Sequence, residues 1–241
     1  MDEMQEYFPT KALRYAEKKM SALLYKEEER LEKLGSVSSQ NLKSEIPNII
    51  KFTEEYEHCF SLYLDAALAQ HQNKIQCKAG CGNCCHHYPM SIEPFEQITF
   101  YAKYRKSDSF FSALEACLFR SRLFHSLYNQ DIEPSSDAEE QILHQYFAKE
   151  TDCPFLNNAR SCSVYDFRPA TCRMYFSETS EEFCTAAYLQ TKWNRSFIIY
   201  LPDYIEEAIA NVSAFYESLE LSESLYTGFV QLNGMDGEFF E

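Results

Sequence analysis

The chain has 241 residues, which is long enough to bury a hydrophobic core without disulfides or metal ions as staples. Its 22 Lys and Arg against 37 Asp and Glu leave a net charge of -15, which disfavours nucleic acid and anionic membrane surfaces as partners. The first residues do not resemble a secretory signal, and no apolar run is long enough to cross a bilayer. We therefore expect a cytoplasmic protein.

The first part of the chain shows apolar residues at helical spacing. This spacing predicts a helix over residues 11–34, which ends at Gly35, and a second helix from about Pro47 to Lys74. Cys59 lies on the second helix among aromatic side chains. We expect it to be a small buried core residue.

The middle of the chain is also predicted to be helical. Ser91 is expected to be the N-cap of a helix whose first turn contains Pro94. Cys117 lies among leucines of the next helical pattern and is expected in the core. The remaining expectations are helices over 110–128, 139–149 and 204–219, and a loop over 131–138.

The chain contains few signals for β-structure. Residues 197–201 are the best strand candidate, and the glycine-containing stretch 228–241 is expected to be a loose tail. We therefore predict a mostly α fold in which two cysteine-rich loops converge on a metal site, with few or no strands. The expected division is a helical region (1–75), a cysteine-cluster metal-binding domain (76–200), and a C-terminal helix and tail (201–241).

The first cysteine group is Cys77-x3-Cys81-x2-Cys84-Cys85. Two glycines lie between these cysteines and supply the permissive backbone that a tight loop needs. Backbone N–H groups in such a loop can point at thiolate sulfurs and reduce the cost of their charge. Four cysteines in so short a span are hard to explain by packing, and we predict that they bind metal.

The second group is Cys153-x8-Cys162-x9-Cys172-x11-Cys184, whose loose spacing alone would be weak evidence. Its context strengthens the interpretation. Pro169 is predicted to start a short helix that carries Cys172 in its first turn, where the helix dipole favours a thiolate. Because a reducing cytoplasm keeps thiols free, metal ligation is favoured over the alternative of a disulfide framework.

Other polar residues near the cysteines have more than one reading. Arg168 could hydrogen-bond a sulfur or a carboxylate, or form an ordinary surface ion pair. His86 and His87 follow the double cysteine, and either could join a mixed zinc site, although position alone is weak evidence. The other four histidines are expected in core or surface roles: His58, His71, His125 and His144.

The combined pattern resembles the YkgJ-type cysteine-cluster family, whose CxxCxxCC domain is described as zinc- or iron-chelating. The resemblance spans residues 77–184, and Glu96 fits a glutamate that recurs after the double cysteine. It implies metal binding and brings no particular activity. It rests on Cys77, Cys81, Cys84, Cys85, Cys153-Pro-Phe-Leu, Cys162-Ser-Val-Tyr165, Arg168-Pro169-Ala-Thr-Cys172 and Cys184.

The bound group is expected to be zinc or an iron–sulfur cluster, with iron–sulfur favoured, since thiolates suit both. Eight cysteines would satisfy two tetrahedral sites of four. Neighbouring side chains diverge, so Cys84 and Cys85 are not expected to serve one ion together. We expect at least one downstream cysteine to join the first group.

Two other functional readings remain open. Flagellin lysine methylases have a similar cysteine run, and the spacing of Cys77, Cys81 and Cys84 matches that of radical S-adenosylmethionine enzymes. An iron–sulfur-dependent enzyme that modifies a protein or peptide is therefore the alternative, although the barrel pattern usual for the radical enzymes is missing. A third reading is an interaction module with purely structural metal, whose acidic N-terminal helices bind a protein partner.

Overall fold

The computed structural model describes residues 10–69, 75–78, 80–128, 136–189 and 191–239. These residues form a mostly α fold with one very small sheet, as predicted. The helices are α1 (Lys11–Leu34), α2 (Leu42–Leu68), α3 (Pro94–Tyr104), α4 (Phe110–Tyr128), α5 (Ser136–Phe147), α6 (Asp203–Ala214) and α7 (Leu225–Phe239), and the strands are β1 (Tyr175–Ser177) and β2 (Ser196–Ile198).

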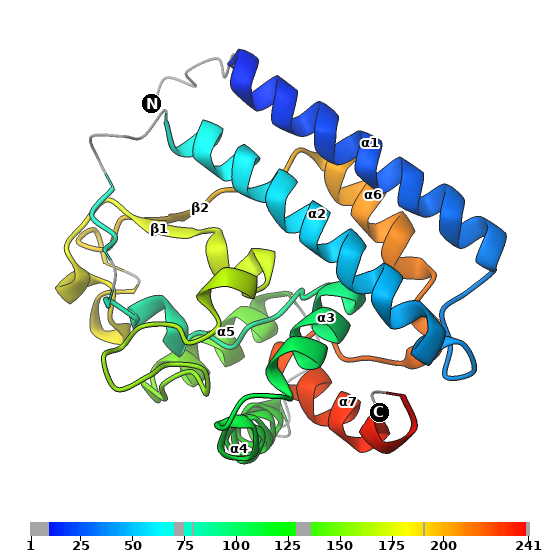
Figure 1. Cartoon of the computed structure of the whole chain (residues 1–241). Helices are drawn as coiled ribbons and strands as arrows, with labels where there is room; N and C mark the ends of the chain where they lie inside the picture. The colour runs from blue at the N-terminus through cyan, green and yellow to red at the C-terminus, as the bar shows by residue number, and fades with distance from the viewer. Residues whose placement is uncertain (1–9, 70–74, 79, 129–135, 190, 240–241) are drawn as a thin grey trace.

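The two long N-terminal helices lie side by side, and α6 packs against α1 (Figure 1). Arg30 on α1 joins them, with Nη2 2.8 Å from Glu27 Oε1 and Nη1 2.5 Å from Glu45 Oε2 on α2. The predicted end of the first helix is confirmed. Gly35 has φ 96°, and its N–H donates to the Leu31 carbonyl at 2.8 Å.

The second helix begins at Leu42, earlier than the predicted Pro47. Leu42 is buried, and Glu45 pairs with Arg30, so tertiary contacts stabilise a turn that Pro47 alone did not signal. The helix ends at Leu68. The predicted end at Lys74 lies outside the described residues.

The start of α3 differs from the prediction. Ser91 is not its N-cap but has a positive φ of 57°. Glu93 occupies the cap, and it forms a capping box with Glu96. Since Pro94 takes the first helical position, the cap has to be the residue directly before it.

Three further predicted helices are present, but the ends of two of them differ from the prediction. The helix over 110–128 is confirmed as α4. α5 begins at Ser136, inside the predicted loop 131–138, of which only the last three residues are described. α6 ends at Ala214 rather than at 219, because the chain turns into a short 3-10 helix, Glu217–Leu219.

The expectation of a loose C-terminal tail is wrong, because Leu225–Phe239 is the helix α7. Its glycines had suggested a flexible segment. One of them, Gly228, has a packing role instead: a Cβ at this position would lie 1.6 Å from Gln97 Oε1 on α3. The small residue lets the two helices approach closely.

The two strands form a short antiparallel sheet beside the cysteine-rich loops (Figure 1). Phe176 pairs with Phe197 at its centre. The predicted strand over 197–201 is therefore found in part, since β2 covers Ser196–Ile198. Its partner β1 was not predicted, because three residues directly after a cysteine turn carry too little pattern to recognise.

An aromatic cluster connects the helices to the second cysteine-rich stretch. Phe155 lies edge-on to Phe100 of α3 at a centroid distance of 4.8 Å and to Phe229 of α7 at 5.7 Å. Phe155 follows Cys153 by two positions, so the buried ring fixes that end of the loop against the core. Among the described residues, no helix combines the length and the apolar character that a membrane crossing requires.

Candidate metal centre

Two glycines with left-handed backbone shape the first cysteine loop. Gly80 has φ 82° and Gly82 has φ 64°, a region that residues with a Cβ rarely adopt. The chain then enters a short 3-10 turn, Asn83–His86. The Cys85 N–H donates to the Gly82 carbonyl at 3.1 Å. The turn thus presents two consecutive thiols, Cys84 and Cys85, at one bend of the chain.

Arg160 of the second stretch holds this loop in place. Its Nε donates to the Cys81 carbonyl at 3.3 Å, and its Nη2 donates to Asn83 Oδ1 at 3.1 Å. A Cβ on Gly82 would lie 3.2 Å from the Arg160 carbonyl oxygen, so this glycine also permits the close approach. Sequence reasoning missed Arg160, because nothing in its spacing from the cysteines distinguishes it from a surface arginine.

The chain between Cys153 and Cys162 folds back on itself. Leu156 and Cys162 form an antiparallel bridge, and the Ser163 N–H donates to the Phe155 carbonyl at 2.8 Å. This reversal brings two cysteines that are separated in sequence to the same end of a hairpin-like turn.

The turn that carries Cys172 agrees with the prediction. Ala170–Arg173 is a short 3-10 helix that follows Pro169, and the Cys172 N–H donates to the Pro169 carbonyl at 3.0 Å. Glu96 on α3 anchors its start, since Glu96 Oε1 accepts a 2.8 Å hydrogen bond from the Ala170 N–H. The glutamate is buried, and burial raises its pKa to about 8.

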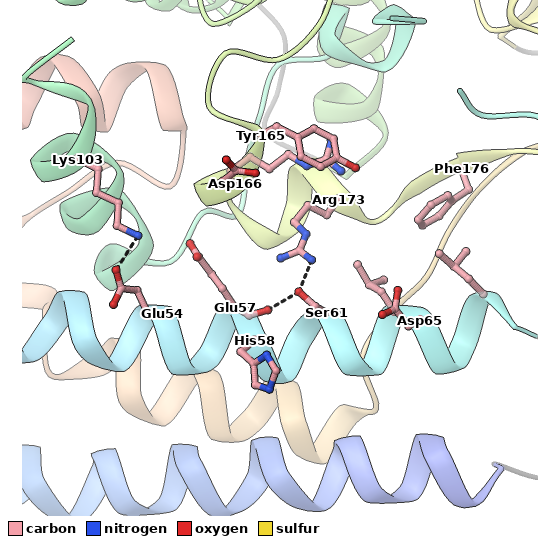
Figure 2. A pocket seen from close by; sticks show the side chains of 13 residues that line it. Glu54, Glu57, His58, Ser61, Asp65, Lys103, Tyr165, Asp166, Arg173 and Phe176 are labelled. Carbon is pink, nitrogen blue, oxygen red and sulfur yellow. Dashed lines mark hydrogen bonds and ion pairs between the residues drawn. The ribbon is translucent and has the colours of Figure 1, made fainter. Parts of the chain in front are cut away.

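A second anchor follows Cys172 directly. Arg173 Nη2 donates to Ser61 Oγ on α2 at 2.6 Å, and the serine in turn donates to the Glu57 carbonyl at 2.8 Å (Figure 2). These contacts lie in a cleft of about 560 Å³ between α2 and the segment from Tyr165 to Phe176. The turn that carries Cys172 is therefore anchored on both sides, by Glu96 on α3 and by Ser61 on α2.

The region before Cys184 lies against the first cysteine loop. The Ser177 N–H on β1 donates to Cys77 Sγ at 3.2 Å. Asn83 Nδ2 donates at 2.7 Å to the carbonyl of Glu181, the first residue of the turn that ends at Cys184. Two cysteine-bearing segments far apart in the sequence thus meet edge to edge.

Electrostatic interactions identify a first set of neighbouring thiols. Burial raises the pKa of Cys77, and negative charge on Cys84, Cys184 or Cys81 raises it further. Burial likewise raises the pKa of Cys81, and charge on Cys84 and Cys184 adds to the effect. Cys184 therefore lies near Cys77 and Cys81.

A second set of neighbours involves the other cysteines. Burial raises the pKa of Cys153 to about 11, and a charge on Cys162 contributes. Burial also raises the pKa of Cys172, with contributions from charge on both of these cysteines. Cys85 interacts in the same way with Cys153 and Cys172. All four thiols line a single cavity of about 1050 Å³.

The consecutive thiols Cys84 and Cys85 contact each other. Their hydrogen bond lowers the pKa of Cys84 to about 7, helped by the positive charge of Arg168, and it raises the pKa of Cys85. The expectation that the two side chains diverge is wrong, because the 3-10 turn holds both sulfurs together. The expected approach of downstream cysteines to the first loop is found.

Residues 76–189 match the model of the CxxCxxCC family, described as a "putative zinc- or iron-chelating domain". The chain carries a CxxCxxCC domain. No curated protein and no solved structure gave a match to the chain. The match covers both cysteine-rich stretches and all eight cysteines of the predicted site.

The donor set of the CxxCxxCC domain fits a thiophilic metal. Free thiols are crowded and partly desolvated, so ionising several of them together is costly unless a cation compensates the charge. Within the described ranges, no three Cys, His, Asp or Glu side chains are already arranged to hold one metal ion. Coordination would therefore require the thiols to rotate toward shared points.

The two histidines of the CxxCxxCC domain have other partners. His86 Nε2 lies 3.0 Å from Asp152 Oδ1. His87 stacks between Phe147 and Tyr175, at centroid distances of 4.1 and 4.9 Å, and burial lowers its pKa to about 4. Both interactions help pack the first loop against the second stretch, which is a structural role.

Arg168 and the two remaining cysteines are also placed. The Arg168 guanidinium stacks on Tyr165 at 4.2 Å from the ring centroid, and its Nε has no hydrogen-bond partner among the described residues. Cys59 and Cys117 are both buried in the helical core, as predicted from the apolar positions around them. Cys59 lies on α2, outside the matched residues, whereas Cys117 lies on α4 between the two cysteine-rich stretches.

Proposed function

We propose that this protein binds an iron–sulfur cluster or zinc, with iron–sulfur favoured, through the eight cysteines of its CxxCxxCC domain. The observation that carries the proposal is that Cys85, Cys153, Cys162 and Cys172 line one cavity, while the turn that ends at Cys184 is hydrogen-bonded to the first loop. If the cysteines served only as core residues, thiols from distant segments would have no reason to lie close together beside polar loop backbone. The proposed ligands are Cys77, Cys81, Cys84, Cys85, Cys153, Cys162, Cys172 and Cys184.

The surroundings of the thiols support ligation. The Ser177 N–H already donates to Cys77 Sγ, and the positive charge of Arg168 favours the ionised forms of Cys84, Cys162 and Cys172. Such donors stabilise thiolates and, through hydrogen bonds to sulfur, set the reduction potential of a bound cluster. A cluster could carry electrons, whereas zinc could only act as a Lewis acid or tie the loops together.

The proposal includes a reducing compartment, the cytoplasm. All ten cysteines are free, which suits a location where thiols stay reduced and available to metal. Oxidation of neighbouring thiols to disulfides would compete directly with binding. The metal content is therefore expected to depend on the exclusion of oxygen during purification.

The decisive experiment is purification of the full chain without oxygen, with its absorption spectrum, metal analysis and acid-labile sulfide measured together. Iron with sulfide and a broad visible absorption would establish a cluster. A colourless protein with stoichiometric zinc would establish the zinc form. Metal-free protein that has eight freely titratable thiols outside the core and unchanged folding would refute the proposal.

An iron–sulfur-dependent enzyme that modifies a protein or peptide is the second candidate. It is favoured by the cavity of about 1050 Å³ beside Cys85, which is large enough for a small molecule or a side chain. The radical S-adenosylmethionine version is disfavoured, because the described residues contain the two-stranded sheet β1–β2 and no barrel. Incubation of the reduced protein with S-adenosylmethionine is expected to give no 5′-deoxyadenosine.

A further inference from the structure

The side-chain amide of Asn83, in the first cysteine loop, contacts two segments that are distant from it in the sequence. Its Nδ2 donates to the Glu181 carbonyl at 2.7 Å, and its Oδ1 accepts from Arg160 Nη2 at 3.1 Å. One amide therefore connects three cysteine-bearing segments, namely the first loop, the segment around Arg160 and the turn that ends at Cys184.

Arg160 reaches the first loop at a second point. Its Nε donates to the Cys81 carbonyl at 3.3 Å. The planar guanidinium thus spans a backbone carbonyl and a side-chain amide, a pattern that the single ammonium group of lysine does not reproduce. Arg160 lies in a turn that the Asn157 N–H closes by donating to the Ser161 carbonyl at 2.9 Å. Since Cys162 follows this turn directly, the contacts of Arg160 also fix where that cysteine segment lies against the first loop.

The backbone of Arg160 is left-handed, with φ 56°. This conformation is unfavourable for a residue with a long side chain, and glycine or asparagine adopts it more readily. Arg160 is exposed, so its side chain adds nothing to the hydrophobic core. What the arginine contributes at this strained position is the pair of hydrogen bonds to the first loop.

These contacts act on the part of metal binding that the thiols cannot supply. A thiol turns toward a metal by rotation of its own side chain, whereas bringing separate segments together costs the entropy of closing the loops between them. Segments that are already joined lose less freedom when a metal arrives, so the affinity is higher. The three hydrogen bonds of Asn83 and Arg160 are exposed, so we expect them to add little to the stability of the helical core.

We propose that Asn83 and Arg160 form a clasp, made of these three hydrogen bonds, that positions the cysteine-bearing segments for metal binding. The clasp rests on the proposed metal-binding function and adds to it two positioning residues that carry no thiol. Neither residue is a ligand. When the clasp is broken, the segments separate more easily and the affinity for metal falls.

The test uses the full chain, prepared metal-free under reducing, oxygen-free conditions and titrated with Zn²⁺ against a competing chelator. Arg160→Gly removes both donors and gives the left-handed backbone a residue that suits it. Arg160→Lys keeps the charge but loses the planar fork, and Asn83→Ala removes both contacts of the amide. Glu220→Gly is the matched control, because Glu220 is also exposed with a left-handed backbone, φ 50°, and lies outside the cysteine-rich stretches.

Arg160→Gly and Asn83→Ala should each lower the affinity for Zn²⁺ by about 10–100-fold, the range usual for residues that orient metal ligands. Arg160→Lys should also bind well below the wild type, and Glu220→Gly should bind like it. Urea unfolding of the metal-free protein is the second readout. Arg160→Gly should unfold at the same or a higher urea concentration than the wild type, because the strain is relieved. A residue that only stabilised the fold would lower the urea midpoint together with the affinity.

Three results would overturn the clasp. The first is wild-type affinity in Arg160→Gly, and the second is wild-type affinity in Arg160→Lys, which would assign the effect to charge alone. The third concerns protein saturated with Co²⁺, whose thiolate-to-cobalt absorption should be the same in the wild type and Asn83→Ala because no thiol is lost. A changed spectrum would make Asn83 a ligand and not a positioning residue.

Failure of the underlying function gives a different result. A wild-type chain that takes up neither Zn²⁺ nor Co²⁺ under these conditions refutes metal binding by the thiols, and the clasp falls with it. A wild-type chain that binds both ions, while Arg160→Gly keeps the same affinity, refutes the clasp alone.

Discussion

Glu96 Oε1 accepts a hydrogen bond of 2.8 Å from the backbone N–H of Ala170, the first residue of the turn that carries Cys172. The glutamate also closes the capping box of α3 through the Glu93 N–H. One buried side chain therefore couples the start of a core helix to the position of a proposed ligand.

The protonation of Glu96 predicts a pH dependence of stability. Burial raises its pKa from 4.5 to about 8, so between these values the folded protein keeps a proton that the unfolded chain has lost. The free energy of unfolding should therefore fall as the pH rises through this window. Glu96→Gln should flatten this dependence, as measured by urea unfolding of the metal-free protein over a pH series.

Glu55→Gln on the exposed side of α2 is the matched control for this experiment, and it should leave the pH profile of the wild type unchanged. Each unit of pKa difference corresponds to about 1.4 kcal/mol, so the effect should exceed experimental error even if burial is relieved in part. An identical pH slope for the wild type and Glu96→Gln would contradict the assignment of the proton to Glu96.

Gly228 and Gly234 on α7 predict opposite effects of the same substitution. Alanine normally stabilises a helix interior by about 1 kcal/mol over glycine. Gly234→Ala should show this gain, since a Cβ there meets nothing within 4 Å. Gly228→Ala should destabilise by about 1–3 kcal/mol, because its Cβ would overlap Gln97 Oε1. Thermal unfolding of the two variants would measure the difference, and equal shifts would argue against the α3–α7 packing.

The ion pairs of Arg30 predict that removing its charge lowers the free energy of unfolding. Arg30→Met would leave Glu27 and Glu45, both largely buried, without their cationic partner. Because Arg30 is itself about one third exposed, at 32 %, solvent offsets part of the effect, and we expect a loss of about 1–3 kcal/mol in urea unfolding. Glu54→Gln, which removes an exposed partner of Lys103, should cost less than about 0.5 kcal/mol.

The two core cysteines provide an internal control for metal binding. Cys59→Ala and Cys117→Ala remove buried thiols that pack among apolar side chains, so each should lower stability slightly and leave the metal content unchanged. Cys172→Ala should lower the metal content of protein purified without oxygen. Equal metal loss from Cys117→Ala and Cys172→Ala would refute the separation of core from ligand cysteines.

The helices could be predicted from sequence wherever an apolar stripe was long and uninterrupted. Lys11–Leu34 and Phe110–Tyr128 have such stripes, and both were found where periodicity placed them. The boundaries failed where tertiary contacts decide them. Leu42 and Glu45 extend α2 to residues before Pro47 through burial and an ion pair. Gly228 suggested a loose tail, but it is a glycine because Gln97 leaves no room for a Cβ there.

In the candidate site, too, the sequence predicts some features, and tertiary contacts decide the others. The eight cysteines were predicted as ligands from the dense spacing of the first group and, for the second group, from its sequence context and the family resemblance. Which cysteines lie together could not be predicted, because the turn that ends at Cys184 meets the first loop through tertiary contacts such as that of Asn83 with the Glu181 carbonyl. Arg160 was missed for the same reason: its partners are a backbone carbonyl and an amide, which leave no pattern in the sequence.

Metal removal should loosen the cysteine loops and leave the long helices intact. The described residues of the loops form short turns and the three-residue strands β1 and β2, so we expect a bound metal to contribute much of the stability of the loops. α1 and α2 bury their own apolar stripes against each other and α6, including Leu13, Leu24 and Phe60. After chelation, amide hydrogen exchange should rise over residues 76–86 and 153–184 and stay unchanged in α1. Uniform acceleration along the chain would mean that the metal supports the whole fold, and no change in the loops would contradict a site that joins them.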